Sequence, residues 1–246
     1  TNSGIGNPLY QMSTLVDKGT SENLTIALGA HWDILPGLSF DPQISTYNIT
    51  NDAYTFQPGY WNGPVSYVTS RNANGNTYRW RQYQADAVFS YVKSIKSSHN
   101  IDAKAGFSYY SRKVSSLSAS GRGASTDLIP TLNAAGEATA VTSSISDQVI
   151  AGYFGNVNYN YKLKYLLSVN ARYDGASNLG ANYKWGFFPW VSGGWNLHKE
   201  KFLRSMPTEF SSFKIRGSYG VNGNISGLSD FQSEGAYGVG AMYNGN

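Results

Sequence analysis

Apolar and polar side chains alternate with a period of two residues through much of this chain. Successive side chains of a β-strand point to opposite faces, so this period predicts strands with one apolar and one polar face. The pattern is clearest in two neighbouring runs, at 149–161 and 165–173, which are separated only by residues 162–164. We therefore expect an antiparallel hairpin there, closed by a tight turn.

The same period recurs in segments spread along the chain. About nine strands are predicted, and many are long enough to cross a bilayer at a tilt, which takes about 9–11 residues. Their polar face carries Asn, Ser, Lys, Arg, Asp and Gly, and such a face suits a water-filled lumen better than a packed core. The predicted fold class is therefore all-β: an antiparallel segment of a transmembrane β-barrel. Besides the two runs above, the segments lie at 23–32, 38–49, 80–92, 101–109, 185–195, 213–221 and, more weakly, 235–243.

The composition agrees with strands that face lipid. Charged residues make up 14% of the chain, well below the roughly 25% of an ordinary soluble domain. Aromatic residues reach 15%, and Tyr and Trp favour the two interfaces between a membrane and water. We expect an interfacial belt, rather than ligand platforms, from Tyr153, Tyr159, Tyr161, Tyr165, Trp185 and Trp195.

Short and long connections alternate along the chain. Long connections then project from the same rim, as in outer-membrane barrels, which have short periplasmic turns and long extracellular loops. The connection at 197–211 is long for a turn, and its segment 199–206 can form one or two helical turns. The short turns are predicted at 33–37, 94–100 and 162–164, and the long extracellular loops at 50–77 and 114–146.

Residues that would support catalysis, metal binding or nucleic-acid binding form no recognisable pattern. The chain has no Cys, which excludes disulfides, thiolate metal sites and Cys nucleophiles. His31, His99 and His198 lie far apart and lack the spacing of metal ligands. Basic residues are scattered, with a net charge of +4, whereas nucleic-acid binding requires a basic patch or stripe. We therefore predict no catalytic residue, no metal or other cofactor, no nucleic-acid partner and no enzymatic activity.

One long connection, 50–77, is the best candidate for binding a ligand. Its aromatic residues interleave with polar ones such as Asn51, Asp52 and Gln57. Aromatic faces can stack on sugar rings while amides and carboxylates bond to hydroxyls, and a peptide would use the same groups. The alternative is a loop that packs against its neighbours or against a partner protein. The candidate substrate-binding residues are Tyr54, Phe56, Tyr60, Trp61 and Tyr67.

The second half of the chain resembles a known family. Several motifs occur in the order found in the SusC/RagA family of TonB-linked outer-membrane transporters, and the most specific is WGFFPWVSGGW at 185–195. The resemblance is strong over roughly 147–224, whereas the upstream part is similar mainly in its layout of strands and loops. The other motifs are GYFGNVNYNY at 152–161, KYLL at 164–167, RYDGAS at 172–177, EKFL at 200–203 and FKIRGSYGVNGN at 213–224.

This resemblance implies a 22-stranded barrel that is filled by an N-terminal plug. It also implies a SusD-like lipoprotein partner, and import of oligosaccharides or peptides driven by the TonB–ExbB–ExbD complex. The protein would cross the bacterial outer membrane many times, in contact with lipid. Because about nine strands cannot close such a barrel, we expect residues 1–246 to be a partial barrel domain, without the plug and the remaining strands. The alternative function is that of a non-transporting all-β surface protein, used for binding, adhesion or structure.

Three charged residues share the predicted lumen face: Arg172, Asp174 and Arg216. Side chains on one face of neighbouring strands can pair across the sheet. These residues can therefore pair with one another, contact the plug or line the transport path. Plug contact or pairing is favoured over contact with substrate.

Overall fold

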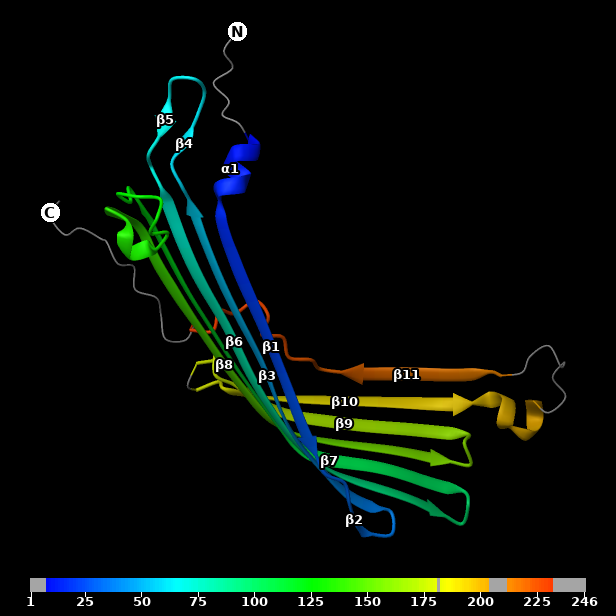
Figure 1. The fold of residues 1–246 in the computed structure, drawn as a ribbon. Helices are drawn as coiled ribbons and strands as arrows, with labels where there is room; N and C mark the ends of the chain where they lie inside the picture. Colours follow the sequence, from blue (N-terminus) through cyan, green and yellow to red (C-terminus); the bar gives the residue numbers. More distant parts are fainter. Residues whose placement is uncertain (1–7, 181, 204–211, 232–246) are drawn as a thin grey trace, which may run out of the picture. The chain divides into compact units, whose positions relative to one another are not determined.

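Strands dominate the computed structural model, which describes residues 8–180, 182–203 and 212–231 (Figure 1). In this part of the chain a hydrogen-bonded sheet has the strand order β1-β3-β6-β7-β8-β9-β10-β11, and β2 adds a ninth strand beside β3. β4 and β5 form a separate two-stranded sheet. The prediction of an all-β fold with about nine strands is confirmed.

The strands differ greatly in length. β3, β6, β7 and β8 have 20, 24, 24 and 25 residues, whereas β9 and β10 have 12 each. Because about 9–11 residues suffice to cross a bilayer, the four long strands extend well beyond that length. The bounds are β1 Val16–Gly29, β2 Trp32–Leu35, β3 Leu38–Gln57, β4 Tyr60–Trp61, β5 Tyr67–Val68, β6 Asn72–Ile95, β7 His99–Arg122, β8 Glu137–Tyr161, β9 Tyr165–Ala176, β10 Trp185–Asn196 and β11 Lys214–Gly220.

The long loops are shorter than predicted, because the strands extend into them. The segments predicted as loops at 50–77 and 114–146 are mostly strand, and the connections themselves span only 58–71 and 123–136. Outside a bilayer a strand does not need a lipid-facing side, so its alternation weakens while neighbouring strands still pair with its backbone. A period-two signal therefore identifies the part of a strand that faces lipid and misses the extension.

Helices are short in the described part of the chain. They are α1 (Pro8–Thr14), which was not predicted, and the 3₁₀ helices η1 (Leu132–Ala134), η2 (Leu197–Lys199) and η3 (Lys201–Leu203). η2 and η3 agree with the helical turns predicted near 199–206, although 204–211 and the weak strand predicted at 235–243 lie outside the described residues. Within the described ranges, no helix has both the length and the apolar character needed to cross a membrane.

The predicted hairpin between β8 and β9 closes in a two-residue turn. The backbone N–H of Lys164 donates to the carbonyl of Tyr161 at 2.8 Å. The two central residues, Lys162 and Leu163, have φ angles of 50° and 55°. Positive φ at both central positions defines a type I′ turn, whose twist matches that of the flanking strands. The β6–β7 hairpin closes in the same way at 96–97.

The chain divides into two compact units. Unit 1 comprises Thr1–Thr25, Thr46–Gln82 and Arg112–Ser146, and unit 2 comprises Ile26–Ser45, Tyr83–Ser111 and Asp147–Asn246. β4 and β5 therefore belong to unit 1, together with the connections at 58–71 and 123–136. β9, β10 and β11 belong to unit 2.

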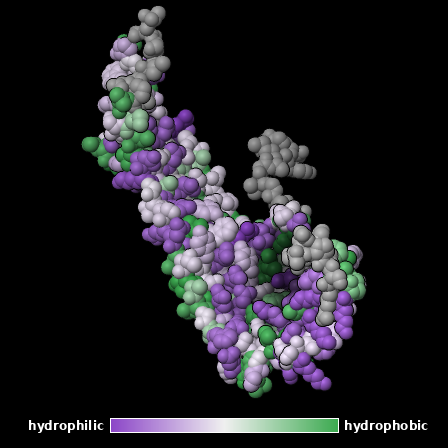
Figure 2. All heavy atoms as spheres, turned by 90° about the vertical axis from the view of Figure 1, so that its right-hand side faces the viewer, coloured by the Kyte–Doolittle hydropathy of each residue, from purple (hydrophilic) through white to green (hydrophobic). Residues whose placement is uncertain are grey.

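The register of β8 to β11 sorts the side chains of this part of unit 2 into two faces. Directly opposed residues of an antiparallel pair lie on the same face, so the pairing defines rows across the strands. The apolar face begins with the row Tyr161, Tyr165, Trp195 and Ile215, continues through the row Val157, Val169, Val191 and Tyr219, and then reaches the row Tyr153, Tyr173 and Phe187. Hydrophobic and hydrophilic residues interleave over the side of the molecule shown in Figure 2.

Aromatic rings line both ends of this apolar face, where the interfacial belt was predicted. At one end the ring centroids of Tyr161 and Tyr165 are 6.4 Å apart, and those of Tyr165 and Trp195 are 6.2 Å apart. At the other end the rings of Tyr173 and Trp185 stack at 5.0 Å. From Tyr165 to the position that pairs with Trp185 the strand advances about 33 Å, which a tilt of about 40° reduces to roughly 25 Å, the height of the apolar band of a membrane barrel.

The opposite face of the same strands is mostly polar, although Phe154, Leu166, Phe188 and Trp190 also lie on it. Asn158, Ser168, Ser192 and Ser218 form one of its rows. The Oγ of Ser168 donates to Oδ1 of Asn158 at 2.7 Å, and Nδ2 of Asn158 donates to Oδ1 of Asn156 at 2.7 Å. Amides and hydroxyls that bond to each other in this way suit a wet surface.

Candidate functional site: an aromatic hairpin and its clasp

The hairpin β4–β5 presents aromatic side chains to solvent. Trp61 pairs with Tyr67 in the ladder, and their ring centroids are 5.1 Å apart at an interplanar angle of 54°. The Trp61 side chain is 54% exposed and that of Tyr67 is 40% exposed. The hairpin continues beyond the ladder, because the N–H of Asn62 donates to the carbonyl of Ser66 at 2.7 Å. Trp61 and Tyr67 thus contact each other, whereas Tyr60 pairs with Val68, and the role of all three in binding a ligand stays a prediction.

Tyr54 and Phe56 do not belong to the connection at 58–71 that contains the hairpin. Both lie on β3, so their predicted location in a loop is wrong. Phe56 is fully buried and packs with Ala73 and Ala124 in the core cluster of unit 1. This burial leaves no ring face for a ligand, and Phe56 is therefore removed from the candidate residues.

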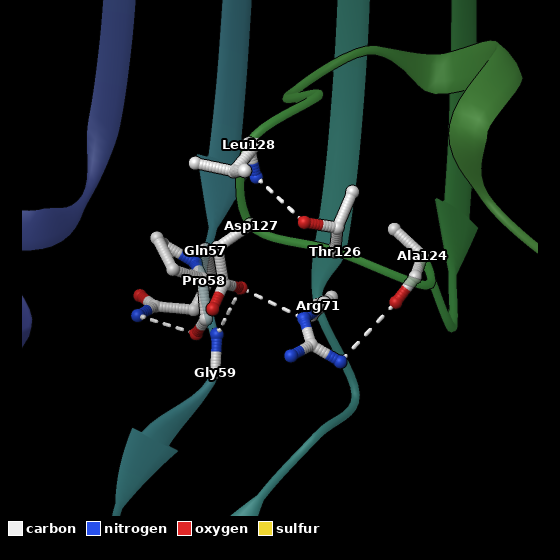
Figure 3. Close-up of polar contacts among 8 residues, drawn as sticks. All are labelled: Gln57, Pro58, Gly59, Arg71, Ala124, Thr126, Asp127 and Leu128. Carbon is white, nitrogen blue, oxygen red and sulfur yellow. Dashed lines mark hydrogen bonds and ion pairs between the residues drawn. The ribbon is translucent and has the colours of Figure 1, made fainter.

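A carboxylate closes the base of the hairpin. Asp127, from the connection between β7 and β8, accepts a hydrogen bond from Nε of Arg71 at 2.7 Å and from the N–H of Gly59 at 2.9 Å (Figure 3). Nη1 of Arg71 also donates to the carbonyl of Ala124 at 3.3 Å. The hydrogen bond from Arg71, followed by that from Gly59, holds the pKa of Asp127 below its ordinary value. We call Asp127, Arg71 and Gly59 the clasp.

The connection at 123–136 folds back onto its own unit. The hydroxyl of Tyr54 donates to the carbonyl of Pro130 at 2.5 Å. Leu132 packs so closely over Gly75 of β6 that a Cβ on Gly75 would lie 2.8 Å from its Cδ1. Tyr54, Gly75 and Leu132 also line a groove of about 390 Å³, together with Leu117. The connection is therefore a packed element rather than a free loop.

The three charged candidates share the polar face, but only Arg172 and Asp174 contact each other. Nε and Nη2 of Arg172 donate to the carboxylate of Asp174 at 2.9 and 3.0 Å, so this ion pair runs along one strand, β9. Arg216 lies on β11, where it pairs with Gly194 of β10. Their common face agrees with the prediction, whereas contact with a plug stays a prediction.

Arg216 instead lines a polar groove of about 590 Å³ in unit 2. Lys214 lies two residues away in the same groove, and Asn158, Ser168 and Ser192 supply amides and hydroxyls. Such a surface can hydrogen-bond a polar ligand or another polar part of a protein. Within the residues that the structure describes, no group of three His, Asp or Glu side chains is placed to hold a metal ion.

Sequence reasoning missed the clasp. Arg71 and Asp127 are 56 positions apart, and neither belongs to an alternating run or to a known motif. Only the pairing of the long strand extensions brings their connections together. No local signal could have identified this contact.

Sequence comparison relates the chain to one group of bacterial proteins. No family model matches it. The chain is 29% identical over 227 residues to TonB-dependent receptor P3 of Formosa agariphila, which covers 90% of this chain and 22% of that receptor. It is 31% identical over 90 residues to TonB-dependent receptor SusC of Bacteroides thetaiotaomicron, which covers 37% of this chain and 9% of SusC. The chain is similar in sequence to TonB-dependent receptors.

A solved structure is similar to the chain in fold. The chain superposes on part of the RagAB peptide importer in its closed-closed state with a TM-score of 0.78 at 19% identity, over 89% of this chain and 24% of that one. At this identity the likeness concerns the fold alone. The predicted resemblance to the SusC/RagA family and the barrel-segment fold class are both confirmed. The chain spans 22% of the length of receptor P3.

Proposed function

We propose that the chain is a barrel segment of a TonB-dependent receptor that imports oligosaccharides or peptides across the bacterial outer membrane. The observation that carries the proposal is the two-faced sheet of β8 to β11, with an apolar face bordered by aromatic rows and a polar face behind it. An apolar face of this height fits lipid, and the polar face fits a lumen. Similarity to TonB-dependent receptors supports transport rather than catalysis as the activity.

In this proposal residues 1–246 are a partial barrel domain. The relatives are several times longer than the part that aligns, and a barrel in lipid must close on itself. The remaining strands and the plug would come from the rest of the receptor. TonB–ExbB–ExbD would act through that plug, and the receptor would span the membrane many times.

A SusD-like lipoprotein is the proposed outer partner. The similarity to SusC and to the RagAB peptide transporter supports this partnership. The polar face, with Arg172, Asp174 and Arg216, would face the lumen and contact the plug. The exposed rings of Trp61 and Tyr67, with the partly buried ring of Tyr60, would contact substrate, because aromatic faces can stack on sugars or on peptide side chains.

Uptake in a deletion strain tests this function. The full-length receptor gene is deleted, and uptake of labelled oligosaccharides and peptides is measured with the wild-type gene, with no gene and with a Tyr60→Ala/Trp61→Ala variant. We expect the deletion to abolish uptake of one nutrient class and removal of TonB to have the same effect. The double variant should raise the concentration for half-maximal uptake about tenfold, since two anchoring rings are lost.

Val65→Ala is the matched control, since Val65 lies at the tip of the same hairpin and is 91% exposed. It should leave uptake unchanged. A deletion that changes the uptake of no oligosaccharide or peptide would refute transport and favour the binding or adhesion alternative.

A further inference from the structure

Arg71 has a backbone conformation that its own residue type disfavours. Its φ is 41°, in the left-handed region where a Cβ crowds the backbone and where Gly or Asn is the usual choice. Such a conformation persists only when surrounding contacts impose it. The side chain of Arg71 is 17% exposed, and its hydrogen bonds to Asp127 and Ala124 hold the residue in this conformation.

The clasp connects to the aromatic rings of the hairpin through Gly59. The hydrogen bond to Asp127 is the main cause of the raised pKa of Arg71, and Tyr67 contributes less. The ring of Tyr67 lies against Gly59, where an added Cβ would come within 2.8 Å of Cζ. Trp61 in turn contacts the Tyr67 ring. A path of contacts thus runs from Asp127 through Gly59 and Tyr67 to Trp61.

Asp127 fixes both ends of the hairpin with one oxygen. Gly59 directly precedes β4, and Arg71 follows β5, and both donate to Oδ1 of Asp127 (Figure 3). A second bond supports the same junction, because the N–H of Gly123 donates to the carbonyl of Ser70 at 2.6 Å. Since the connection at 123–136 is itself packed onto unit 1, Asp127 ties the hairpin to a packed neighbour.

We propose that Arg71 and Asp127 are positioning residues, which hold the hairpin β4–β5 against the connection at 123–136 so that Trp61 and Tyr67 meet substrate in one fixed orientation. The effect on substrate binding rests on the proposed uptake function, whereas the position of the hairpin does not. A fixed aromatic pair binds without first losing the freedom of its loop, and this preorganisation raises affinity.

Distances between spin labels test the geometry without substrate. Val65 and Leu128 are 91% and 89% exposed, and residues 1–246 contain no Cys. Labelled Cys residues at both positions, in a full-length receptor from which any other Cys is removed, report on the two connections. We expect one narrow distance distribution in the wild type and a broad one in Asp127→Asn and in Arg71→Ala. A distribution that stays narrow in both variants would overturn the inference.

Glu137→Gln is the matched control. Glu137 forms a two-bond ion pair with Arg122 at 2.8 and 3.1 Å at the foot of the same connection, with both side chains more than half exposed. Exposed pairs of this kind contribute little to stability, and this pair does not touch the hairpin bonds described above. The distance distribution should therefore remain narrow.

Uptake tests the consequence. In Asp127→Asn we expect the concentration for half-maximal uptake to rise roughly two- to tenfold, the equivalent of ordering one or two side chains on binding, while the maximal rate and the receptor level stay unchanged. The positioning role would be overturned if Asp127→Asn broadens the distance distribution but leaves uptake unchanged, while Tyr60→Ala/Trp61→Ala impairs uptake. If the double variant itself has no effect, the proposed substrate contact fails, and the spin-label result still decides the geometry.

Discussion

Glu200 shows how a single residue can fix the end of the sheet. It lies between η2 and η3, outside the strands, and its side chain is 12% exposed. It accepts hydrogen bonds from Nζ of Lys164 at 3.0 Å, the hydroxyl of Tyr165 at 2.8 Å and Nε1 of Trp195 at 3.2 Å. These bonds, with that of Lys164 largest, lower the pKa of Glu200 from 4.5 to about 2. One carboxylate thereby holds a turn and two rings of the aromatic row.

The lowered pKa predicts how stability depends on pH. A group whose pKa is lower in the folded state stabilises that state above its unfolded pKa, and the contribution is lost as the pH falls through the folded value. The contribution of Glu200 should therefore be complete above about pH 5 and should fall between pH 4.5 and pH 2. Unfolding of the full-length receptor in detergent, measured with and without Glu200→Gln, should show a smaller loss of stability on acidification in the variant. Parallel curves for the two proteins would contradict this prediction.

The hairpins show what can be derived from sequence at the scale of elements. Alternation in 149–161 and 165–173 predicts β8, β9 and the turn at 162–164, because a lipid-facing side imposes the period-two pattern. It does not predict the parts of β3, β6, β7 and β8 outside that region, where neighbours rather than lipid determine the strand. The placement of Trp61 beside Tyr67 depends on those extensions, and so does the clasp. The aromatic composition of the connection led to the prediction of a binding site, which stays a prediction, and it could not show that Phe56 is buried.

The type I′ turn between β8 and β9 carries a residue that does not favour it. Leu163 has a φ of 55°, which costs a residue with a Cβ about 1–2 kcal/mol. Leu163→Gly should therefore raise the free energy of unfolding by about 1 kcal/mol, part of the gain being offset by the greater freedom of the unfolded chain. Leu163→Ala removes the same half-exposed side chain but keeps the strain, so it should give no increase. Urea unfolding in detergent measures both variants, and equal effects of Gly and Ala would show that the turn is not strained.

At the scale of the whole molecule, the decisive property is the separation of two environments by one sheet. The row that contains Val169 and Val191 belongs to an apolar surface between aromatic ends, and the two rows that contain Asn170 and Ser192 belong to the opposite surface. In a soluble sandwich the apolar side would be covered by a second sheet. Here Val169 and Val191 are 44% and 43% exposed within the described chain. In the proposed function this exposure has a purpose, since lipid covers the outer face of a membrane barrel.

Collision of spin labels with oxygen and with a water-soluble nickel chelate tests this separation most directly. Labels are placed at Val169 and Val191 on one face, and at Asn170 and Ser192 on the other, in the full-length receptor in a lipid bilayer. Oxygen concentrates in hydrocarbon and the nickel chelate is excluded from it, so we predict a high ratio of oxygen to nickel collisions at the two valines and a low ratio at the two polar positions. A ratio that does not alternate between neighbouring residues, or nickel collisions at the valines that equal those with oxygen, would contradict the account.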